Sequence, residues 1–216
     1  MNILITGANR GIGLEMVRYA MRQGWRVFAC CRNPHNDENL FNIAKLSNGL
    51  ISVHIVDMNE LTTLQALSYE LRNDAIDILI NNAGNSSMVA IADMDEETWD
   101  AVLDTHLKGM FLCCRYVLPH MIAQQSGNVI SISSVGGQRG FGMGGHYCAA
   151  KHGIIGLNKA IAMEVADHNI RANVVCPGTV WTDMMKGIAE FFGMEEEEAK
   201  EQFFQGHMIQ DPEVTT

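Results

Sequence analysis

The chain alternates short runs of apolar and β-branched residues with longer stretches in which apolar residues recur at helical spacing. The short runs are typical of strands, and the longer stretches are typical of amphipathic helices. We expect strands at 2–6, 26–31, 50–56, 76–80, 128–133 and 171–176. We expect helices at about 11–23, 38–47, 60–73, 95–123 and 146–167. This alternation predicts a parallel sheet built from right-handed crossovers.

The expected strands contain few polar residues. The run 76–80, for example, is almost continuously apolar, as expected of a strand that helices cover on both faces. We therefore predict an α/β fold, a doubly wound parallel sheet of Rossmann-like type. No repeat or Ser/Gly/Pro-rich linker divides the chain, so we expect a single domain over residues 1–216. Ligands of such sheets bind beyond the carboxyl ends of the strands, where candidate chemistry must be sought.

The net charge and the hydropathy of the chain argue against nucleic acid and membranes as binding partners. The chain has 25 acidic and 15 basic residues and a formal net charge of −10, which disfavours nucleic acid and anionic membranes. No apolar run approaches the roughly 20 residues that cross a bilayer, and the N-terminus lacks the pattern of a signal peptide. We expect a cytoplasmic protein that binds neither nucleic acid nor membrane.

The six cysteines form two adjacent pairs and two single positions, without a C-x-x-C motif or the spacing of a disulfide framework. The eight histidines are scattered and contain no metal-binding motif. We expect buried free thiols and no metal site, with a metal or redox role for the cysteines as the alternative.

A glycine-rich segment, Thr6-Gly7-Ala8-Asn9-Arg10-Gly11-Ile12-Gly13, follows the first expected strand and opens the first helix. Glycines let a backbone turn tightly and approach a pyrophosphate, whose charge is met by amides at the helix N-terminus. A purely structural turn is the alternative. The position between the first strand and the first helix favours a dinucleotide site.

The end of the second expected strand bears on which dinucleotide binds. NAD sites of this fold normally carry an acid there, which accepts hydrogen bonds from the ribose 2′-OH. Here the stretch is Phe28-Ala29-Cys30-Cys31-Arg32, without an acid, and Arg10 lies in the glycine-rich segment. Two guanidinium groups suit a 2′-phosphate. We favour NADP(H) over NAD(H), and the alternative is that both arginines are ordinary surface residues.

Three residues in the second half could carry proton chemistry. Ser134 ends the fifth expected strand, and Tyr147 and Lys151 share one face of a helix. A nearby ammonium favours phenolate, so Lys151 is expected to lower the pKa of Tyr147. Such a tyrosine can exchange a proton with a carbonyl or alcohol oxygen while hydride moves at carbon. Taken alone, the Tyr-Lys pair could also be two surface neighbours.

Together these segments resemble the short-chain dehydrogenase/reductase family over residues 1 to about 185. The family's motifs occur in the usual order: Thr6-Gly7-x-x-x-Gly11-x-Gly13, Asp57, Asn81-Asn82-Ala83-Gly84, Ser134, Tyr147-x-x-x-Lys151 and Pro177-Gly178-x-x-x-Thr182. The resemblance implies an NADP(H)-dependent carbonyl reductase or alcohol dehydrogenase. A small hydrophobic carbonyl or alcohol compound would be its substrate.

The resemblance also implies a role for each matching position. Tyr147 would be the general acid/base, Ser134 would orient the substrate carbonyl, and Lys151 would hold the nicotinamide ribose. Arg10 and Arg32 would bind the 2′-phosphate. The residues expected to bind the cofactor are Gly7, Asn9, Arg10, Gly11, Ile12, Gly13, Arg32, Asp57, Asn82, Ala83, Gly84, Tyr147, Lys151, Pro177, Gly178, Val180 and Thr182.

The chain departs from the family pattern at His106. The family usually has an Asn there, whose backbone carbonyl helps to hold a water that links the lysine to solvent. This chain reads Thr105-His106-Leu107-Lys108-Gly109. His106 is therefore a fourth catalytic candidate, with simple packing on the helix face as the alternative.

Family members are commonly longer and end with a further helix and a seventh strand. We therefore expect six strands here, with the strand near 171–176 at an exposed edge. Such an edge favours a homo-oligomer (dimer or tetramer), in which another subunit covers it, or a truncated family member. A truncated, catalytically impaired nucleotide-binding homologue is the alternative to an active enzyme.

Residues 183–208 are the expected substrate lid. Methionines and phenylalanines at helical spacing flank the acidic run Glu195–Glu198. Such residues also serve ordinary packing. If they close over the site together with Phe141, Met143 and His146, they favour a hydrophobic substrate.

Overall fold

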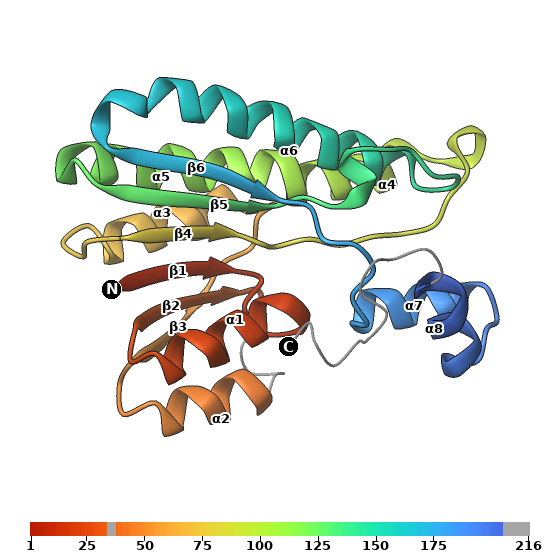
Figure 1. Cartoon of the computed structure of the whole chain (residues 1–216), viewed down its shortest axis with the longest axis horizontal. Coiled ribbons are helices and arrows are strands. Elements are labelled where there is room, and N and C mark those ends of the chain that lie inside the picture. The colour runs from red at the N-terminus through yellow and green to blue at the C-terminus, as the bar shows by residue number, and fades with distance from the viewer. Residues whose placement is uncertain (34–37, 205–216) are drawn as a thin grey trace.

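Six parallel strands run through the centre of the molecule (Figure 1). The computed structural model describes residues 1–33 and 38–204. The strands are β1 Asn2–Thr6, β2 Arg26–Cys31, β3 Ile51–Ile55, β4 Ile78–Asn81, β5 Gly127–Ile132 and β6 Ile170–Val175. The sheet order is β3-β2-β1-β4-β5-β6, and every neighbouring pair is parallel. The predicted doubly wound α/β fold, with six strands, is confirmed.

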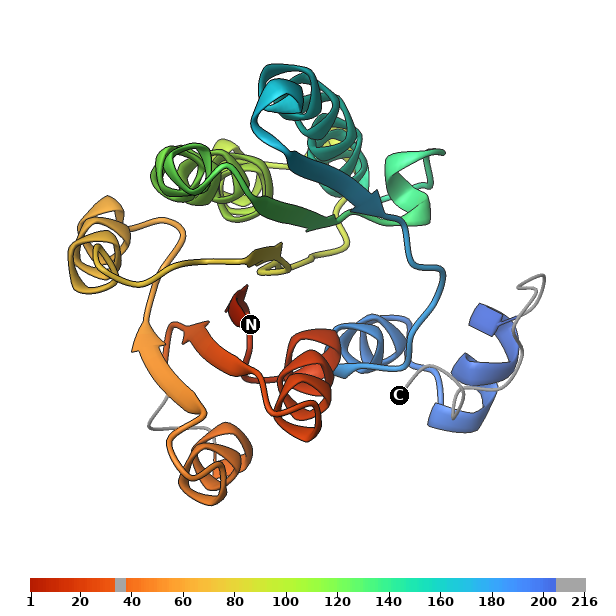
Figure 2. The ribbon, with the colours of Figure 1, turned by 60° about the vertical axis from the view of Figure 1, so that its left-hand side comes forward.

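Helices cover both faces of this sheet (Figures 1 and 2). The longer helices are α1 Gly11–Arg22, α2 Glu38–Leu46, α3 Leu61–Glu70, α4 Glu96–Leu103, α5 Gly109–Gln124, α6 Gly145–Glu164, α7 Asp183–Phe191 and α8 Glu196–Phe204. Apolar side chains of α3, α5 and α6 form one core against the sheet. Those of α1 and α2 form a second core on the opposite face. Because helices pack on both faces of the inner strands, these strands are almost continuously apolar.

The boundaries predicted from periodicity differ most in the region of α4 and α5. The sequence predicts one helix over 95–123, whereas the structure inserts a wider π-helical turn, Asp104–Lys108, between the two helices. A Cβ at Gly109 would lie 3.0 Å from the Met58 side chain, so the turn approaches the segment after β3 closely. Single π-helical turns are frequent at functional sites, and this one carries His106.

The cysteines are free thiols, and five of the six are buried; Cys176 is half-buried. Burial raises the pKa of the Cys30, Cys113 and Cys114 thiols, the last to about 12. These thiols are therefore protonated at neutral pH and pack as small apolar groups. Within residues 1–33 and 38–204, no cluster of His, Cys, Asp or Glu suits a metal ion, and no helix is long and apolar enough to span a bilayer.

Within residues 1–33 and 38–204, β6 is the edge strand of the sheet next to β5, as expected. Its side chains alternate in exposure, and Arg171, Asn173 and Val175 face outward. The carboxyl ends of all the strands meet at one end of the molecule, where α7 and α8 also lie (Figure 1). Segments far apart in the sequence therefore converge at this end.

Candidate active site

A cleft with a volume of about 870 Å³ lies beyond the carboxyl ends of the strands. Its walls are the segments that follow all six strands, β1 to β6, together with parts of α7 and α8. The cleft brings together these residues expected from the sequence: Gly7, Asn9, Arg10, Gly11, Ile12, Arg32, Asp57, Asn82, Ala83, Gly84, His106, Ser134, Tyr147, Lys151, Pro177, Gly178, Val180 and Thr182. Gly13 does not line it.

Gly13 instead serves the close packing of the glycine-rich loop. A Cβ at this position would overlap the carbonyl oxygen of Gly7 and crowd the side-chain amide of Asn82. Gly7 has a φ of +64°, and a Cβ there would lie 2.8 Å from the Cα of Ala83. Both positions thus require glycine: Gly13 because there is no space for a side chain, and Gly7 also because of its backbone conformation.

Hydrogen bonds tie this loop to the segment after β4. The Asn82 amide nitrogen donates to the carbonyl oxygens of Thr6 and Gly7, at 3.0 and 3.1 Å. The Thr6 hydroxyl accepts from the backbone N–H groups of Asn82 and Ala83, each at 3.0 Å. Asn82 therefore ties the glycine-rich loop to the segment after β4. The family resemblance had implied only that Asn82 binds the cofactor.

The N-terminus of α1 opens into the cleft without a side-chain cap. Arg10 is the cap residue but makes no capping hydrogen bond, and the first turn contains no acid. Gly11 and Ile12 in this turn line the cleft. Uncapped amides at a helix N-terminus bind phosphate oxygens. Together with the space that Gly7 and Gly13 preserve, this loop fits the pyrophosphate of a dinucleotide.

Ser134, Tyr147 and Lys151 converge on one wall of the cleft. Ser134 follows β5, and its hydroxyl accepts from the Gly136 N–H at 3.0 Å. Its interaction with Tyr147 lowers the pKa of the phenol. The ammonium of Lys151 lies 5.5 Å from the centre of the Tyr147 ring and donates to the Ile132 carbonyl oxygen at 2.8 Å. The arrangement supplies two hydroxyls to one substrate oxygen, with an amine beside them.

The pKa of Tyr147 shifts in the opposite direction from the sequence-based prediction. Burial raises it above the usual value of 10.0, and the hydrogen bond with Ser134 opposes this shift only in part. Burial also lowers the pKa of Lys151 to about 7, so this amine is only partly charged at neutral pH. The Tyr147 phenol is therefore protonated at neutral pH and can donate a proton.

The lowered pKa of Lys151 makes the stability of the ligand-free protein depend on pH. Between about pH 7 and pH 10.5, the unfolded chain binds a proton on this amine that the folded chain lacks. Stability attributable to Lys151 therefore rises with pH in this window, by at most about 1.4 kcal/mol per pH unit. We expect urea unfolding at several pH values to show this rise for wild type and not for Lys151→Met. Parallel stability profiles for the two proteins would contradict it.

His106 is buried beside Tyr147, and the two rings meet edge to face with centres 5.5 Å apart. Its Nε2 lies 2.7 Å from the Asn85 carbonyl oxygen and 3.1 Å from the Asn85 N–H. Burial lowers the pKa of His106 to about 3, so the ring is neutral at physiological pH. A neutral ring that donates from Nε2 to Asn85 leaves Nδ1 as an acceptor. His106 can orient its neighbours but cannot act as a cationic acid.

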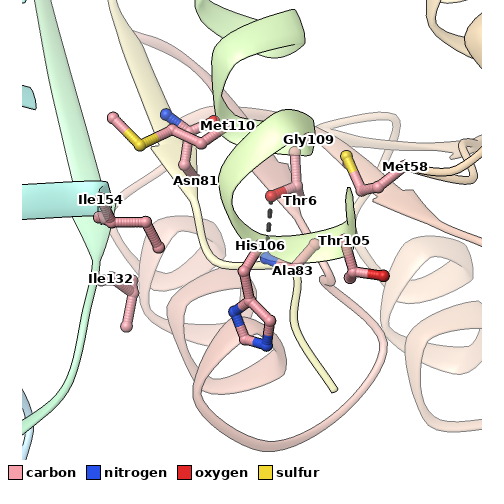
Figure 3. A pocket seen from close by; sticks show the side chains of 10 residues that line it. All are labelled: Thr6, Met58, Asn81, Ala83, Thr105, His106, Gly109, Met110, Ile132 and Ile154. Atoms are coloured by element: carbon pink, nitrogen blue, oxygen red, sulfur yellow. Dashed lines mark hydrogen bonds between the residues drawn. The ribbon is translucent and has the colours of Figure 1, made fainter. Parts of the chain in front are cut away.

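Gly84 and a small cavity surround this ring. A Cβ at Gly84 would overlap the edge of the His106 ring. Position 84, in the segment after β4, therefore requires glycine while the ring is in this position. Behind it lies a cavity of about 10 Å³, close to the size that holds one water molecule. Figure 3 shows the imidazole extending away from Asn81 and Met110, and the hydrogen bond from Ala83 to Thr6 nearby. His106 is therefore held in a single orientation.

Two residues that sequence reasoning associated with the substrate lie behind the cleft wall. His146 is fully buried, and its Nε2 lies 2.8 Å from the Ser87 hydroxyl. The Met143 carbonyl accepts from the Val89 N–H at 2.9 Å. Both contacts fasten the segment after β4 to the start of α6. Of Phe141, Met143 and His146, which were expected to contact the substrate, only Phe141 lines the cleft. The centre of its ring lies 6.0 Å from that of Tyr147.

The helices α7 and α8 form the apolar side of the cleft, lined by Met184, Met185, Ile188, Phe192 and Phe203. The Thr179 hydroxyl donates to the Phe203 carbonyl oxygen at 3.1 Å. The Trp181 indole donates to Glu196 at 3.0 Å. These bonds fasten α8 to the segment after β6. Residues 205–208 of the expected lid lie outside the described residues.

The buried hydrogen bonds that join β5 to α6, one of them at Lys151, were not identified from the sequence. The Ser133 hydroxyl donates to the Lys151 carbonyl oxygen at 2.9 Å, and the Ser131 hydroxyl donates to Asn158 at 3.0 Å. The sequence indicates these bonds only through polar residues that interrupt apolar stretches of β5 and α6. The partners become neighbours only when the strand and the helix pack together.

The model of the family described as short chain dehydrogenase matches residues 1–191. The chain belongs to this family. Among curated proteins, it is 34% identical to the 3-oxoacyl-[acyl-carrier-protein] reductase FabG of Thermotoga maritima, over 87% of this chain and 77% of that protein. It is 33% identical to the FabG of Chlamydia muridarum, over 87% of this chain and 77% of that protein.

Solved structures of this short-chain dehydrogenase fold agree with the sequence match. An actinorhodin polyketide ketoreductase solved with NADPH has a TM-score of 0.87 and 32% identity, and the match covers 99% of this chain and 87% of that one. ElxO with NADP bound has a TM-score of 0.86 and 25% identity, over 99% and 88% of the two chains. Other neighbours include a 4-hydroxyisoleucine dehydrogenase complexed with NADH.

Proposed function

We propose that this short-chain dehydrogenase reduces a ketone or aldehyde with NADPH and uses Tyr147 as the proton donor. The observation that carries the proposal is the convergence of Ser134, Tyr147 and Lys151 in the cleft that the glycine-rich loop enters. Relatives named as 3-oxoacyl-[acyl-carrier-protein] reductases and a ketoreductase solved with NADPH support the same reaction class.

A bound NADPH would supply the hydride. The protein would contribute the hydroxyls of Ser134 and Tyr147, which both line the cleft and can both donate to one substrate oxygen. Tyr147 would give up its proton as negative charge develops on that oxygen. Its raised pKa keeps the phenol protonated at neutral pH, which favours reduction over oxidation of an alcohol. Lys151 would hold the nicotinamide ribose with its partly charged amine.

His106 would act as a positioning residue in this reaction. It contacts the Tyr147 ring and binds Asn85, so it would fix both the phenol and the segment after β4. Its pKa of about 3 excludes proton donation by an imidazolium near neutral pH.

The choice of NADPH over NADH rests on Arg10 and Arg32, which are both exposed and both line the cleft. A guanidinium bonded to a 2′-phosphate contributes about 1.5–3 kcal/mol. We expect Arg32→Gln to weaken NADPH binding by about 10–100-fold and to change NADH binding much less. Isothermal titration of both nucleotides measures this difference.

The matched control is Arg22→Gln, because Arg22 is an exposed arginine at the far end of α1. It should leave both affinities as in wild type. Equal losses of NADPH and NADH binding in Arg32→Gln would reject the 2′-phosphate assignment.

The test of the reaction class is NADPH oxidation, followed by its absorbance, with a panel of ketones, aldehydes and short oxoacyl thioesters. Nucleotide binding is measured separately on the same folded sample. Turnover of hydrophobic carbonyl compounds is expected, since the lid side of the cleft is apolar. Tight NADPH binding without oxidation across the whole panel would instead support a nucleotide-binding homologue without catalytic activity.

A further inference from the structure

One cation in the cleft is not used by the proposed reaction. The charged side chains that line the cleft are Arg10, Arg32, Asp57, Arg139, Lys151 and Asp183. The cofactor assignment accounts for the first three, and the proposed reaction uses Lys151. Arg139 lies on the loop between β5 and α6, on the same wall as the catalytic serine and tyrosine.

The loop that carries Arg139 is anchored to the catalytic residues. The Arg139 N–H donates to the Val135 carbonyl oxygen at 3.0 Å, and the Val135 N–H donates to Pro177 at 3.0 Å. Phe141, two residues later, packs against the Tyr147 ring. Arg139 thus has a backbone position set relative to the reacting centre, while its side chain is long enough to reach along the cleft.

The surroundings of Arg139 favour a bound anion. Across residues 1–33 and 38–204, its guanidinium forms no ion pair with a carboxylate. The cleft is also lined by the apolar residues Met184, Met185 and Phe192, which follow Asp183 in and after α7. Arg139 is exposed and lines the cleft, so an anion that enters the cleft can reach its guanidinium.

The loop and the lid helices face each other at the end of the molecule where the strands terminate (Figure 1). A substrate whose carbonyl lies at Tyr147 would therefore extend between Arg139 and the apolar residues of α7. Arg139 suits an oxyanion of the substrate, and the apolar residues of α7 suit a hydrocarbon part of it.

We propose that the substrate of this enzyme is a carbonyl compound with a second, anionic group, and that Arg139 binds that oxyanion. This inference rests on the proposed carbonyl reduction and adds its substrate class. The anion is a carboxylate or a phosphate, since a guanidinium binds both through paired hydrogen bonds. An uncharged apolar chain links it to the carbonyl.

The experiment compares unbranched oxo acids with their methyl esters, lengthening the chain between the ketone and the carboxylate one methylene at a time. For wild type, the ratio of kcat/KM for acid to ester should exceed about tenfold at the best length. A second arm compares dihydroxyacetone phosphate with dihydroxyacetone and separates a phosphate preference from a carboxylate preference.

In Arg139→Gln, this ratio should fall by about 10–100-fold towards one, mainly through KM. Arg139→Lys should retain an intermediate ratio, because it keeps the charge and loses the planar fork. Arg115→Gln is the matched control, since Arg115 is an exposed arginine on α5 outside the cleft. It should leave the ratio as in wild type.

The outcomes separate this inference from the proposed function. Turnover of acids and esters at equal efficiency, or a preference that Arg139→Gln leaves intact, would overturn the anion site and leave carbonyl reduction standing. A clear preference for uncharged thioesters would likewise overturn it. Failure to reduce any carbonyl compound would overturn the proposed function and the anion site together.

Discussion

Tyr147→Phe is expected to lower kcat by about 10²–10⁴-fold, the usual contribution of a positioned general acid. NADPH affinity should stay within a few-fold of wild type. The substitution removes the proton donor but keeps the ring that packs against His106 and Phe141, so the wall of the cleft should retain its shape. Steady-state NADPH oxidation gives kcat, and isothermal titration gives the nucleotide affinity.

Tyr69→Phe is the matched control, because Tyr69 is 70% exposed on α3 and does not line the cleft. Its kcat should equal that of wild type. If Tyr147→Phe retained most of the turnover, another group would have to supply the proton, and the assignment of Tyr147 would be wrong.

Gly13→Ala is expected to destabilise the fold and to weaken cofactor binding together. The new Cβ would overlap the Gly7 carbonyl oxygen and press on Asn82, and overpacking of this kind costs about 1–3 kcal/mol. Displacement of the phosphate loop also loses amide contacts that are worth about 1.5–3 kcal/mol when they bind a charged group. We expect a lower Tm and an NADPH affinity reduced by at least about tenfold.

Gly156→Ala makes the same chemical change at another helical glycine. A Cβ at Gly156 meets nothing within 4 Å, so this variant should gain up to about 1 kcal/mol from the helix preference of alanine. Its NADPH affinity should not change. Thermal unfolding and titration of the two variants side by side measure the contrast. Equal stability of both would show that the glycine-rich loop tolerates a side chain.

The sheet and its ligand-binding end could be predicted from the sequence because the relevant signals are local. Apolar runs locate the strands to within about two residues, and the parallel crossovers place the ends of β1, β4 and β5 together. Motifs separated by more than a hundred residues, such as the glycine-rich loop and Tyr147, therefore meet in one cleft.

The features that could not be predicted depend on burial and on contacts between distant segments. The pKa of Tyr147 rises because desolvation outweighs its interaction with Ser134, while the amine of Lys151 is itself buried. Spacing along a helix carries no information on desolvation. The pairing of His146 with Ser87 and the π-helical turn at His106 likewise depend on how the segment after β4 packs.

Transfer of deuterium from NADPH that carries deuterium at both C4 positions of the nicotinamide tests the central claim most directly. With a reducible ketone, the label should appear at the carbinol carbon of the product alcohol, as measured by mass spectrometry. The rate of label transfer should collapse in Tyr147→Phe. An unlabelled alcohol, or NADPH consumption without any alcohol, would contradict a hydride transfer that is coupled to proton donation by Tyr147.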